Sequence, residues 1–313
     1  MIEIYYIDKK IKKGNINELA KLKDKKIWVD ITNISKQESI LLGKTFNLHH
    51  LTIEDIFNSN VRIKIEEFPE YLFCVFYGIR KTKQIELLEL DFLIGSNFII
   101  TNHKKDIGSY NELKKDGAML ESLFAKGNEF VFHKLLDMEI DNYFPILETI
   151  DDQIELIEEK VTQRPTPELL QKIFKLKRSV VLIKKATFPQ REKISFLAKN
   201  EYKHISKKSL PYFRDIYDHA IRVSDAIDNY REAISNTFDV YMSAVSNNMN
   251  EVMKTLSIIA TIALPLTVIS GIYGTNFSVL PGQHFAFGFW VMIAFMIMMV
   301  LGMLYYFRRK NWF

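Results

Sequence analysis

The sequence predicts an α+β domain, followed by a long stalk helix that continues into a two-helix transmembrane hairpin. Three observations lead to this prediction. Charged residues are dense up to about residue 255, whereas long charge-free segments follow it. No proline or glycine occurs between Pro211 and Pro265, so more than fifty consecutive residues are compatible with one helix. Before residue 125, short segments rich in β-branched and aromatic residues alternate with helical patterns.

The overall composition excludes several classes of protein. Hydrophobic residues make up 48% and charged residues 26%, averages that conceal the segregation of the two kinds. The net charge of +4 is too small to indicate a nucleic-acid partner. Cys74 is the only cysteine, so no intrachain disulfide can form. Residues 1–5 have neither a basic nor an apolar signal region, so we expect no cleavable leader.

Residues 1–128 are predicted to form the α+β domain. We expect strands at 2–7, 27–31, 71–77, 87–94 and 98–101, and helices at 35–46 and 52–57. Thr52 and Asp55 are expected to form a capping box at the second helix. Gly43-Lys44-Thr45 resembles the end of a P-loop, but Glu38 stands where the first glycine should be. No nucleotide site is therefore expected, and no motif in the sequence indicates an enzyme.

Residues 129–211 are predicted to form a helical hairpin within the same domain. Its first helix carries a run of acidic residues from Glu148 to Glu159, and its lysine-rich return helix is expected at 169–186, before Pro189. We expect the acids to pair with the lysines of the return helix. A surface that attracts divalent ions is the alternative.

The remaining segments are predicted to form the membrane part. Residues 212–255 are the expected stalk, 256–273 and 285–307 the transmembrane helices, 274–284 an extracellular loop, and 308–313 a basic tail. The two spans would be about 27 Å and about 34 Å long, against a hydrocarbon core of about 30 Å. Lys254 and the tail are basic, whereas the loop contains no lysine or arginine. The positive-inside rule therefore predicts cytoplasmic termini.

One face of the stalk and first span has a polar–apolar–polar pattern. Its positions recur at steps of three and four, an average spacing typical of parallel helices around a common axis. The face comprises Asp239, Ser243, Ser246, Asn250, Met253, Leu256 or Ser257, Ala260, Leu264, Thr267 and Gly271. A coiled-coil seam would be apolar at most positions, so the pattern favours the lining of a water-filled pore. Two helices cannot enclose a pore, and several copies of the chain are therefore expected.

The turn after the first span carries Tyr273, Gly274, Thr275 and Asn276. Short polar residues beside glycine are, by themselves, typical of an ordinary turn. With its surroundings, however, the chain resembles the CorA-type magnesium/cobalt transporters. The resemblance rests on IIATI at 258–262, PLT at 265–267, GIYG at 271–274, NF at 276–277, the tail at 306–312, PYFRDIYDH at 211–219, DVY at 239–241 and, more weakly, LTIEDI at 51–56.

The resemblance implies a homopentamer in the cell (inner) membrane, with a funnel-shaped cytoplasmic α/β/α domain. Its function would be the uptake of Mg²⁺, and of Co²⁺, down the electrochemical gradient, gated by cytoplasmic Mg²⁺ and without a nucleotide. Five copies of Asn276, with Gly274, Thr275 and Tyr273, would form the outer mouth. Asp215, with Asp218 nearby, would belong to a regulatory Mg²⁺ site between subunits.

The chain departs from the family pattern in three places. Thr275 stands where the family usually has methionine, and residues 278–284 contain no acid, although Mg²⁺-transporting relatives often have glutamates there. The partner carboxylate of Asp215 is expected after the strand at 71–77, but residues 78–83 are basic. A Zn²⁺, Co²⁺ or Ni²⁺ transporter of the same fold, with or without proton coupling, is therefore the alternative. A membrane-anchored metal sensor is the alternative from another class.

Overall fold

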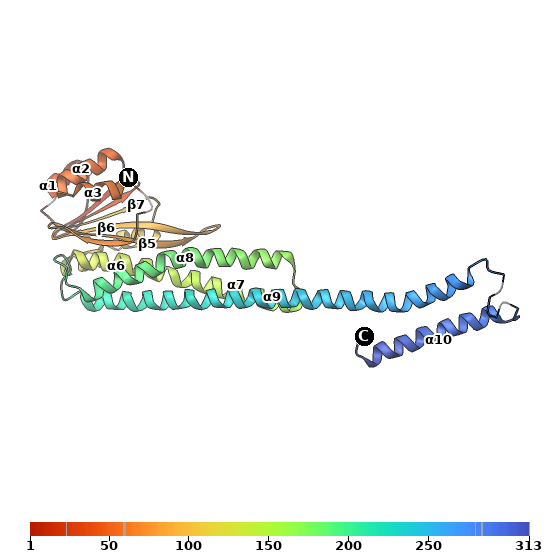
Figure 1. The fold of residues 1–313 in the computed structure, drawn as a ribbon. Helices are drawn as coiled ribbons and strands as arrows, with labels where there is room; N and C mark the ends of the chain where they lie inside the picture. The colour runs from red at the N-terminus through yellow and green to blue at the C-terminus, as the bar shows by residue number, and fades with distance from the viewer. Residues whose placement is uncertain (23, 59–60, 279, 283, 313) are drawn as a thin grey trace. The chain divides into compact units, whose positions relative to one another are not determined.

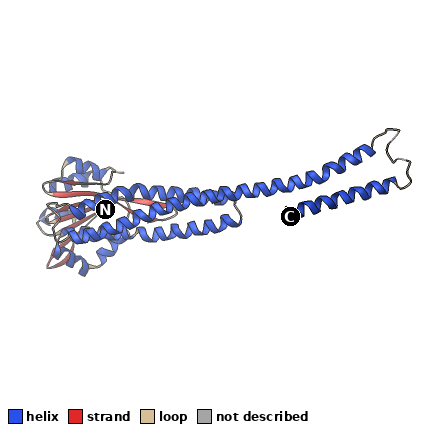
Figure 2. Ribbon diagram, turned by 60° about the horizontal axis from the view of Figure 1, so that its bottom comes forward, coloured by secondary structure: helices blue, strands red, loops and turns tan. Residues whose placement is uncertain are grey.

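The computed structural model describes residues 1–22, 24–58, 61–278, 280–282 and 284–312, so Val279 and Gln283 of the predicted outer loop lie outside the described residues. By their internal contacts the residues form two compact units. The first comprises Met1–Lys160 and Thr166–Phe238, and the second comprises Val161–Pro165 and Asp239–Phe313. Within the described part of the chain, strands occur only in the first unit (Figure 2).

The first unit is built on a mixed sheet of seven strands, in the order β2-β1-β3-β7-β6-β5-β4. β3 and β7 pair in parallel, and all other neighbours pair antiparallel. All the strands predicted from the sequence are present. Their bounds are β1 Ile2–Asp8, β2 Lys10–Gly14, β3 Ile27–Thr32, β4 Lys64–Glu67, β5 Tyr71–Lys81, β6 Ile85–Gly95 and β7 Phe98–His103.

Helices cover both faces of this sheet, so the first unit has the predicted α/β/α layers (Figure 1). In β5, Cys74 and Phe76 pack into one buried apolar cluster, whereas Phe73 and Val75 pack into another. This alternation follows from the two-residue period of a strand. The helices that pack on the cluster of Phe73 and Val75 are α1 Leu19–Leu22, α2 Lys36–Phe46 and α3 His50–Phe57. Those that pack on the cluster of Cys74 and Phe76 are α4 Gly108–Lys115, α5 Gly117–Lys126 and α6 Asn128–Asp141.

The capping box expected at Thr52 is wrong. The residue that caps α3 is His49, and the structure has a capping box instead at α2, between Ser35 and Glu38. Thr52 is buried, and its hydroxyl lies 2.7 Å from the hydroxyl of Tyr71. Burial at the sheet therefore decides the role of this threonine, because a buried hydroxyl needs a hydrogen-bond partner.

The return helix, α8, extends over Pro167–Lys199 and passes through Pro189, so the prediction that it ends before this proline is wrong. Beyond the proline, Ile194 and Leu197 are fully buried in the cluster that faces the sheet. Burying two such side chains stabilises the helix by about 3–6 kcal/mol. An internal proline costs about 3 kcal/mol, so the burial can offset it.

The acidic helix, α7, extends over Tyr143–Gln163, and its acids at 148–158 do not form the expected pairs with α8. Among the described residues, no acid at 148–158 forms an ion pair with a lysine of α8. Instead, Glu158 accepts a hydrogen bond from Thr237 at 2.8 Å, and Lys184 of α8 pairs with Asp228 at 2.5 Å. Both of these partners belong to the stalk helix.

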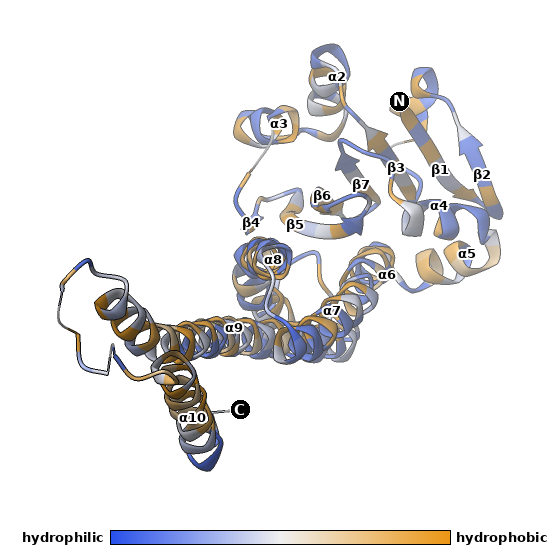
Figure 3. Ribbon diagram, turned by 90° about the vertical axis from the view of Figure 1, so that its right-hand side faces the viewer, coloured by the Kyte–Doolittle hydropathy of each residue, from blue (hydrophilic) through white to orange (hydrophobic). Residues whose placement is uncertain are grey.

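The stalk helix, α9, runs from Leu210 to Tyr273, which confirms the single long helix predicted from the absence of helix breakers. Its 64 residues correspond to about 96 Å. The last helix, α10, extends over Gly288–Arg309. Both helices contain segments long and apolar enough to cross a membrane, and almost no residue of these segments is buried. Figure 3 shows the apolar character of α10 and of the α9 segment in the second unit.

Candidate functional site

The predicted pore face of α9 is exposed along its whole length in the single chain. All of its residues, from Asp239 to Gly271, are exposed. The apolar members include Met253 at 56%, Leu256 at 58% and Leu264 at 67% exposure. A continuous apolar surface of this kind is typical of one that another molecule covers. The chain itself therefore leaves this face available to lipid or to further copies of α9.

A different side of α9 contacts the segment that follows α10. The Lys254 ammonium donates a hydrogen bond to the Asn311 carbonyl at 3.3 Å, and Ile258, one turn along the same side, is buried. At the end of α10, Phe307 is buried and stacks on Trp312 with a centroid separation of 5.5 Å. Residues two apart on a helix point about 200° from each other, so Ile258 faces away from Ala260. α10 therefore leaves the predicted pore face uncovered.

Hydrogen bonds join the turn that follows α9 to the last turn of that helix. The Gly274 N–H donates to the Ser270 carbonyl at 2.9 Å, and the Thr275 hydroxyl donates to the Ile272 carbonyl at 2.7 Å. Asn276 is exposed and forms no hydrogen bond with the described residues. The amide of Asn276 is therefore free to bind a ligand or its hydration shell.

The glycines of this turn differ in what they contact. A Cβ on Gly274 would lie 3.1 Å from the Ser270 carbonyl oxygen, closer than side chains ordinarily approach. A Cβ on Gly271 would meet nothing within 4 Å. Packing inside the chain therefore accounts for Gly274 but gives no reason for Gly271.

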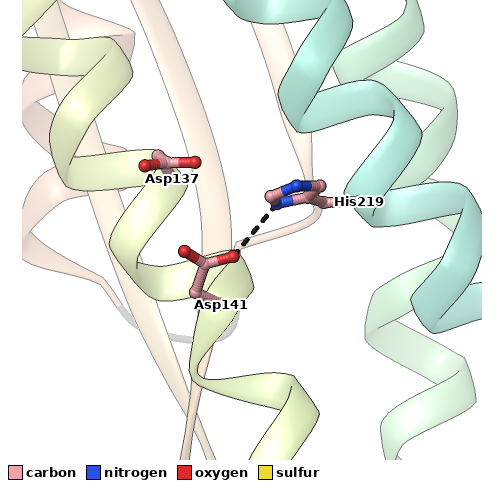
Figure 4. Close-up of side chains that lie close together, drawn as sticks. All are labelled: Asp137, Asp141 and His219. Carbon is pink, nitrogen blue, oxygen red and sulfur yellow. Dashed lines mark hydrogen bonds and ion pairs between the residues drawn. The ribbon is translucent and has the colours of Figure 1, made fainter.

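A second candidate site, in the first unit, joins α6 to α9. Asp137 and Asp141 of α6 and His219 of α9 point toward one another (Figure 4), with one ligand atom of each within 4.8 Å of the others. The His219 Nδ1 atom lies 3.0 Å from an Asp141 carboxylate oxygen, and Lys134 pairs with Asp137 at 3.0 Å. Two carboxylates and an imidazole can hold a divalent cation, and their partial exposure leaves room for water ligands.

Asp215, predicted to be regulatory, lies beside this cluster on α9. It is exposed and is one helical turn from His219, so the two share a side of the helix. Burial lowers the pKa of His133, and the charges of Asp137 and Asp215 oppose that shift. Both carboxylates are therefore close enough to His133 to affect its pKa, which places Asp215 in the same region of the surface as Asp137. Asp218 is exposed and has no ion-pair partner among the described residues.

Asp137 and Asp141 are not among the site residues predicted from the sequence. Their four-residue spacing on a predicted helix was a usable signal, because such residues share one face. The partner carboxylate sought after β5 is not there: the strand continues to Lys81, and Arg80 pairs with Glu86 at 3.1 Å. The acids near Asp215 come from α6 instead.

Comparisons with known proteins agree with this architecture. The model of a family described as CorA-like Mg²⁺ transporter protein matches residues 23–309. The chain is 34% identical, over 91% of its length and 83% of the relative, to the cobalt/magnesium transport protein CorA of Thermotoga maritima. It is 25% identical to the CorA protein of Methanocaldococcus jannaschii, over 91% of each chain.

Solved structures give the same fold. The complete structure of the CorA magnesium transporter from Methanocaldococcus jannaschii matches with a TM-score of 0.87, at 24% identity, over 100% of this chain and 99% of that chain. The full-length CmaX protein matches with a TM-score of 0.79, at 20% identity, over 99% of this chain and 97% of that chain. At these identities the likeness concerns the fold.

Proposed function

This chain belongs to the family of CorA-like Mg²⁺ transporter proteins, and from this premise we propose that it carries Mg²⁺, and Co²⁺, into the cell through a central pore. Five copies of the chain would surround the pore in the inner membrane, with both termini in the cytoplasm. The observation that carries the proposal is the exposed polar–apolar–polar face of α9. Just beyond the end of this helix lies Asn276, which forms no hydrogen bond with the described residues. A membrane anchor alone would not need polar residues along that face.

The outer mouth would select ions by their hydration. Mg²⁺ prefers six oxygen ligands and loses its waters reluctantly. A ring of five Asn276 amides can accept hydrogen bonds from those waters without removing them, whereas an anionic ring would hold the ion too tightly for flux. Tyr273, Gly274 and Thr275 complete this mouth in the proposal. Gly271 would allow close approach of neighbouring helices at the axis, which accounts for a glycine that its own chain does not require.

The inner part of the pore would act as a gate. Met253, Leu256, Ala260 and Leu264 would form an apolar collar that stops ions by dewetting. Polar residues would flank this collar, with Thr267 on one side and Asn250 and Ser246 on the other. Asp239 would form an acidic ring at the cytoplasmic exit. The membrane potential supplies about 2.3 kcal/mol per charge per 100 mV, hence about 4.6 kcal/mol for a divalent ion. No nucleotide is then needed.

The cytoplasmic unit would sense the ion that the pore passes. The cluster of Asp137, Asp141 and His219, with Asp215 and Asp218 on the same acidic surface, would bind a divalent cation and stabilise the closed state. In this organisation residues 1–128 and 129–211 form the sensing domain, and residues 212–255 form the stalk. The membrane hairpin consists of the helices at 256–273 and 285–307, joined by the outer loop at 274–284 and followed by the basic tail at 308–313.

A second candidate is a Zn²⁺, Co²⁺ or Ni²⁺ transporter of the same fold, with or without proton coupling. Two observations favour it. Imidazole is a better ligand for these metals than for Mg²⁺, and His219 belongs to the acidic cluster. The outer loop at 278–284 contains no acid to attract Mg²⁺.

Ion flux into liposomes tests the proposal. The full-length chain, reconstituted with an internal Mg²⁺-sensitive dye, should pass Mg²⁺ when a potential is applied, and Asn276→Ala should reduce that flux. We expect a loss of about tenfold or more, because one hydrogen bond to a charged species contributes about 1.5 kcal/mol or more. Asn248→Ala is the matched control, since Asn248 is also exposed on α9 but lies off the predicted face.

The outcomes separate the alternatives. If Asn276→Ala conducts Mg²⁺ as well as the parent, the outer-ring model is wrong. If the parent passes Zn²⁺ or Ni²⁺ but not Mg²⁺, the second candidate is correct. A chain that passes none of these ions would favour the membrane-anchored sensor.

A further inference from the structure

A cavity of about 340 Å³ lies in the first unit, between the turn of β5 and β6, helix α7 and helix α8. Its apolar lining is aliphatic and includes Ile146, Ile150 and Ile157 of α7 and Leu176 of α8. No aromatic side chain lines it among the described residues. The volume falls within the range of small-molecule sites, which are mostly apolar with a few charged or polar groups.

Lysines are the only charged residues that line this cavity in the described chain. They come from three elements that are distant in sequence: Lys81 and Lys83 from the β5–β6 hairpin, Lys160 from α7, and Lys172 and Lys175 from α8. All of them are exposed, and none forms an ion pair with a described carboxylate. The abundant acids of α7 do not line the cavity. Five lysines from three elements therefore line one apolar cavity, and none of them forms an ion pair within the part of the chain that the structure describes.

We propose that this cavity binds a small anionic amphiphile, with a phosphate group among the lysines and an aliphatic chain inside. Ammonium groups bind phosphate oxygens as point charges, and convergence of several lysines compensates for the weak contribution of each exposed charge. The aliphatic lining fits an alkyl or acyl chain better than a nucleobase, which would stack on aromatic side chains. The site is separate from the ion pathway, and its existence does not depend on the proposed transport function.

Calorimetric titration of the full-length chain in nanodiscs tests this proposal, with empty nanodiscs as the blank. Octyl phosphate is the probe, because it is soluble and combines both chemical features. Inorganic phosphate and octanol each supply one feature alone. We expect saturable binding of octyl phosphate, one molecule per chain, and at least about tenfold weaker binding of the other two compounds.

Two double variants test the role of the lysines. Lys172→Gln with Lys175→Gln should weaken the binding of octyl phosphate about tenfold. Lys177→Gln with Lys185→Gln should not, since these lysines are exposed on the same helix but do not line the cavity. Gln153→Trp should also abolish binding, because the indole would fill the cavity without any change of charge.

Several results would overturn the proposal. One is the absence of saturable binding of octyl phosphate to the parent. Others are equal losses in the two double variants, equal binding of octanol, or equal binding of inorganic phosphate. Full protection of the cavity lysines from acetylation in the ligand-free parent would also overturn it, since it would mean that another part of the assembly covers the site.

Discussion

Asp141→Asn should weaken the response of the cytoplasmic unit to divalent cations. Asp141 supplies one of two carboxylates in the cluster with Asp137 and His219. The substitution removes one negative charge and keeps the shape of the side chain. The remaining aspartate and imidazole could still hold a cation, so we expect weaker binding and not complete loss.

The size of the effect follows from the geometry. The ligand atoms lie within 4.8 Å of one another. Mg²⁺ keeps most of its waters, so a cation held through them would lie at about this distance from each carboxylate. At about 4.8 Å, two unit charges interact by about 0.9 kcal/mol in water and about 3.5 kcal/mol at an effective dielectric of about 20, and a divalent ion doubles both values. The Asp141 side chain is 49% exposed, so solvent screening favours the lower limit. A loss of about 2 kcal/mol corresponds to about thirtyfold in affinity.

The assay is protection from limited proteolysis in the full-length chain in nanodiscs. The Mg²⁺ concentration that gives half-maximal protection should be about thirtyfold higher for Asp141→Asn than for the parent. Glu148→Gln is the matched control, because it removes one exposed acid on the adjacent helix α7, outside the cluster.

Two outcomes would refute this reasoning. If Asp141→Asn and the parent are protected at the same Mg²⁺ concentration, the cluster does not bind the regulatory ion. If Glu148→Gln shifts the midpoint as much as Asp141→Asn, the effect reflects the general negative charge of the unit and not a site.

Two further predictions concern the stability of the first unit. Lys114→Met should lower its free energy of unfolding by about 3 kcal/mol, because the ammonium lies 2.5 Å from a carboxylate oxygen of buried Asp30 and 2.7 Å from Glu3. Urea unfolding followed by circular dichroism measures this, and the exposed control Lys115→Met should change it by less than about 0.5 kcal/mol. Burial raises the pKa of Asp30, but His103 and Lys114 outweigh burial and hold the pKa below its ordinary value. The contribution of Asp30 to the free energy of unfolding is therefore complete above about pH 4 and is lost as the pH falls through the lowered pKa. Asp30→Asn should for this reason reduce the loss of stability in acid. An unchanged acid dependence in Asp30→Asn would contradict this.

Local patterns in the sequence were sufficient to predict the two apolar helical segments and five of the seven strands of the sheet, but not the edge strands β2 and β4. The helix α9 could be predicted because its limits depend on the absence of proline and glycine over a long stretch. The strands could be predicted because side chains alternate between two buried faces. The long charge-free segments likewise predicted the apolar parts of α9 and α10, which are almost entirely exposed in the single chain.

Local rules failed where burial competed with them. Thr52 matches a capping pattern, yet it is buried at the sheet and bonds to Tyr71. Pro189 should end a helix, yet α8 continues because Ile194 and Leu197 have apolar partners across the fold. In both places the free energy of packing exceeded the local preference, and the sequence near these residues does not reveal those partners.

The sequence by itself determined the two candidate spans, the long helix and the turn that follows it, because each depends on interactions between residues close along the chain. Only the tertiary structure brought Asp141 to His219, which are separated by 78 positions. Likewise, only the fold gathered Lys81 of a hairpin with Lys160 and Lys172 of two helices around one cavity. Such sites require elements from different parts of the chain to pack together. The helical or strand periodicity of one element depends only on its own residues, so it does not predict which distant element packs against it.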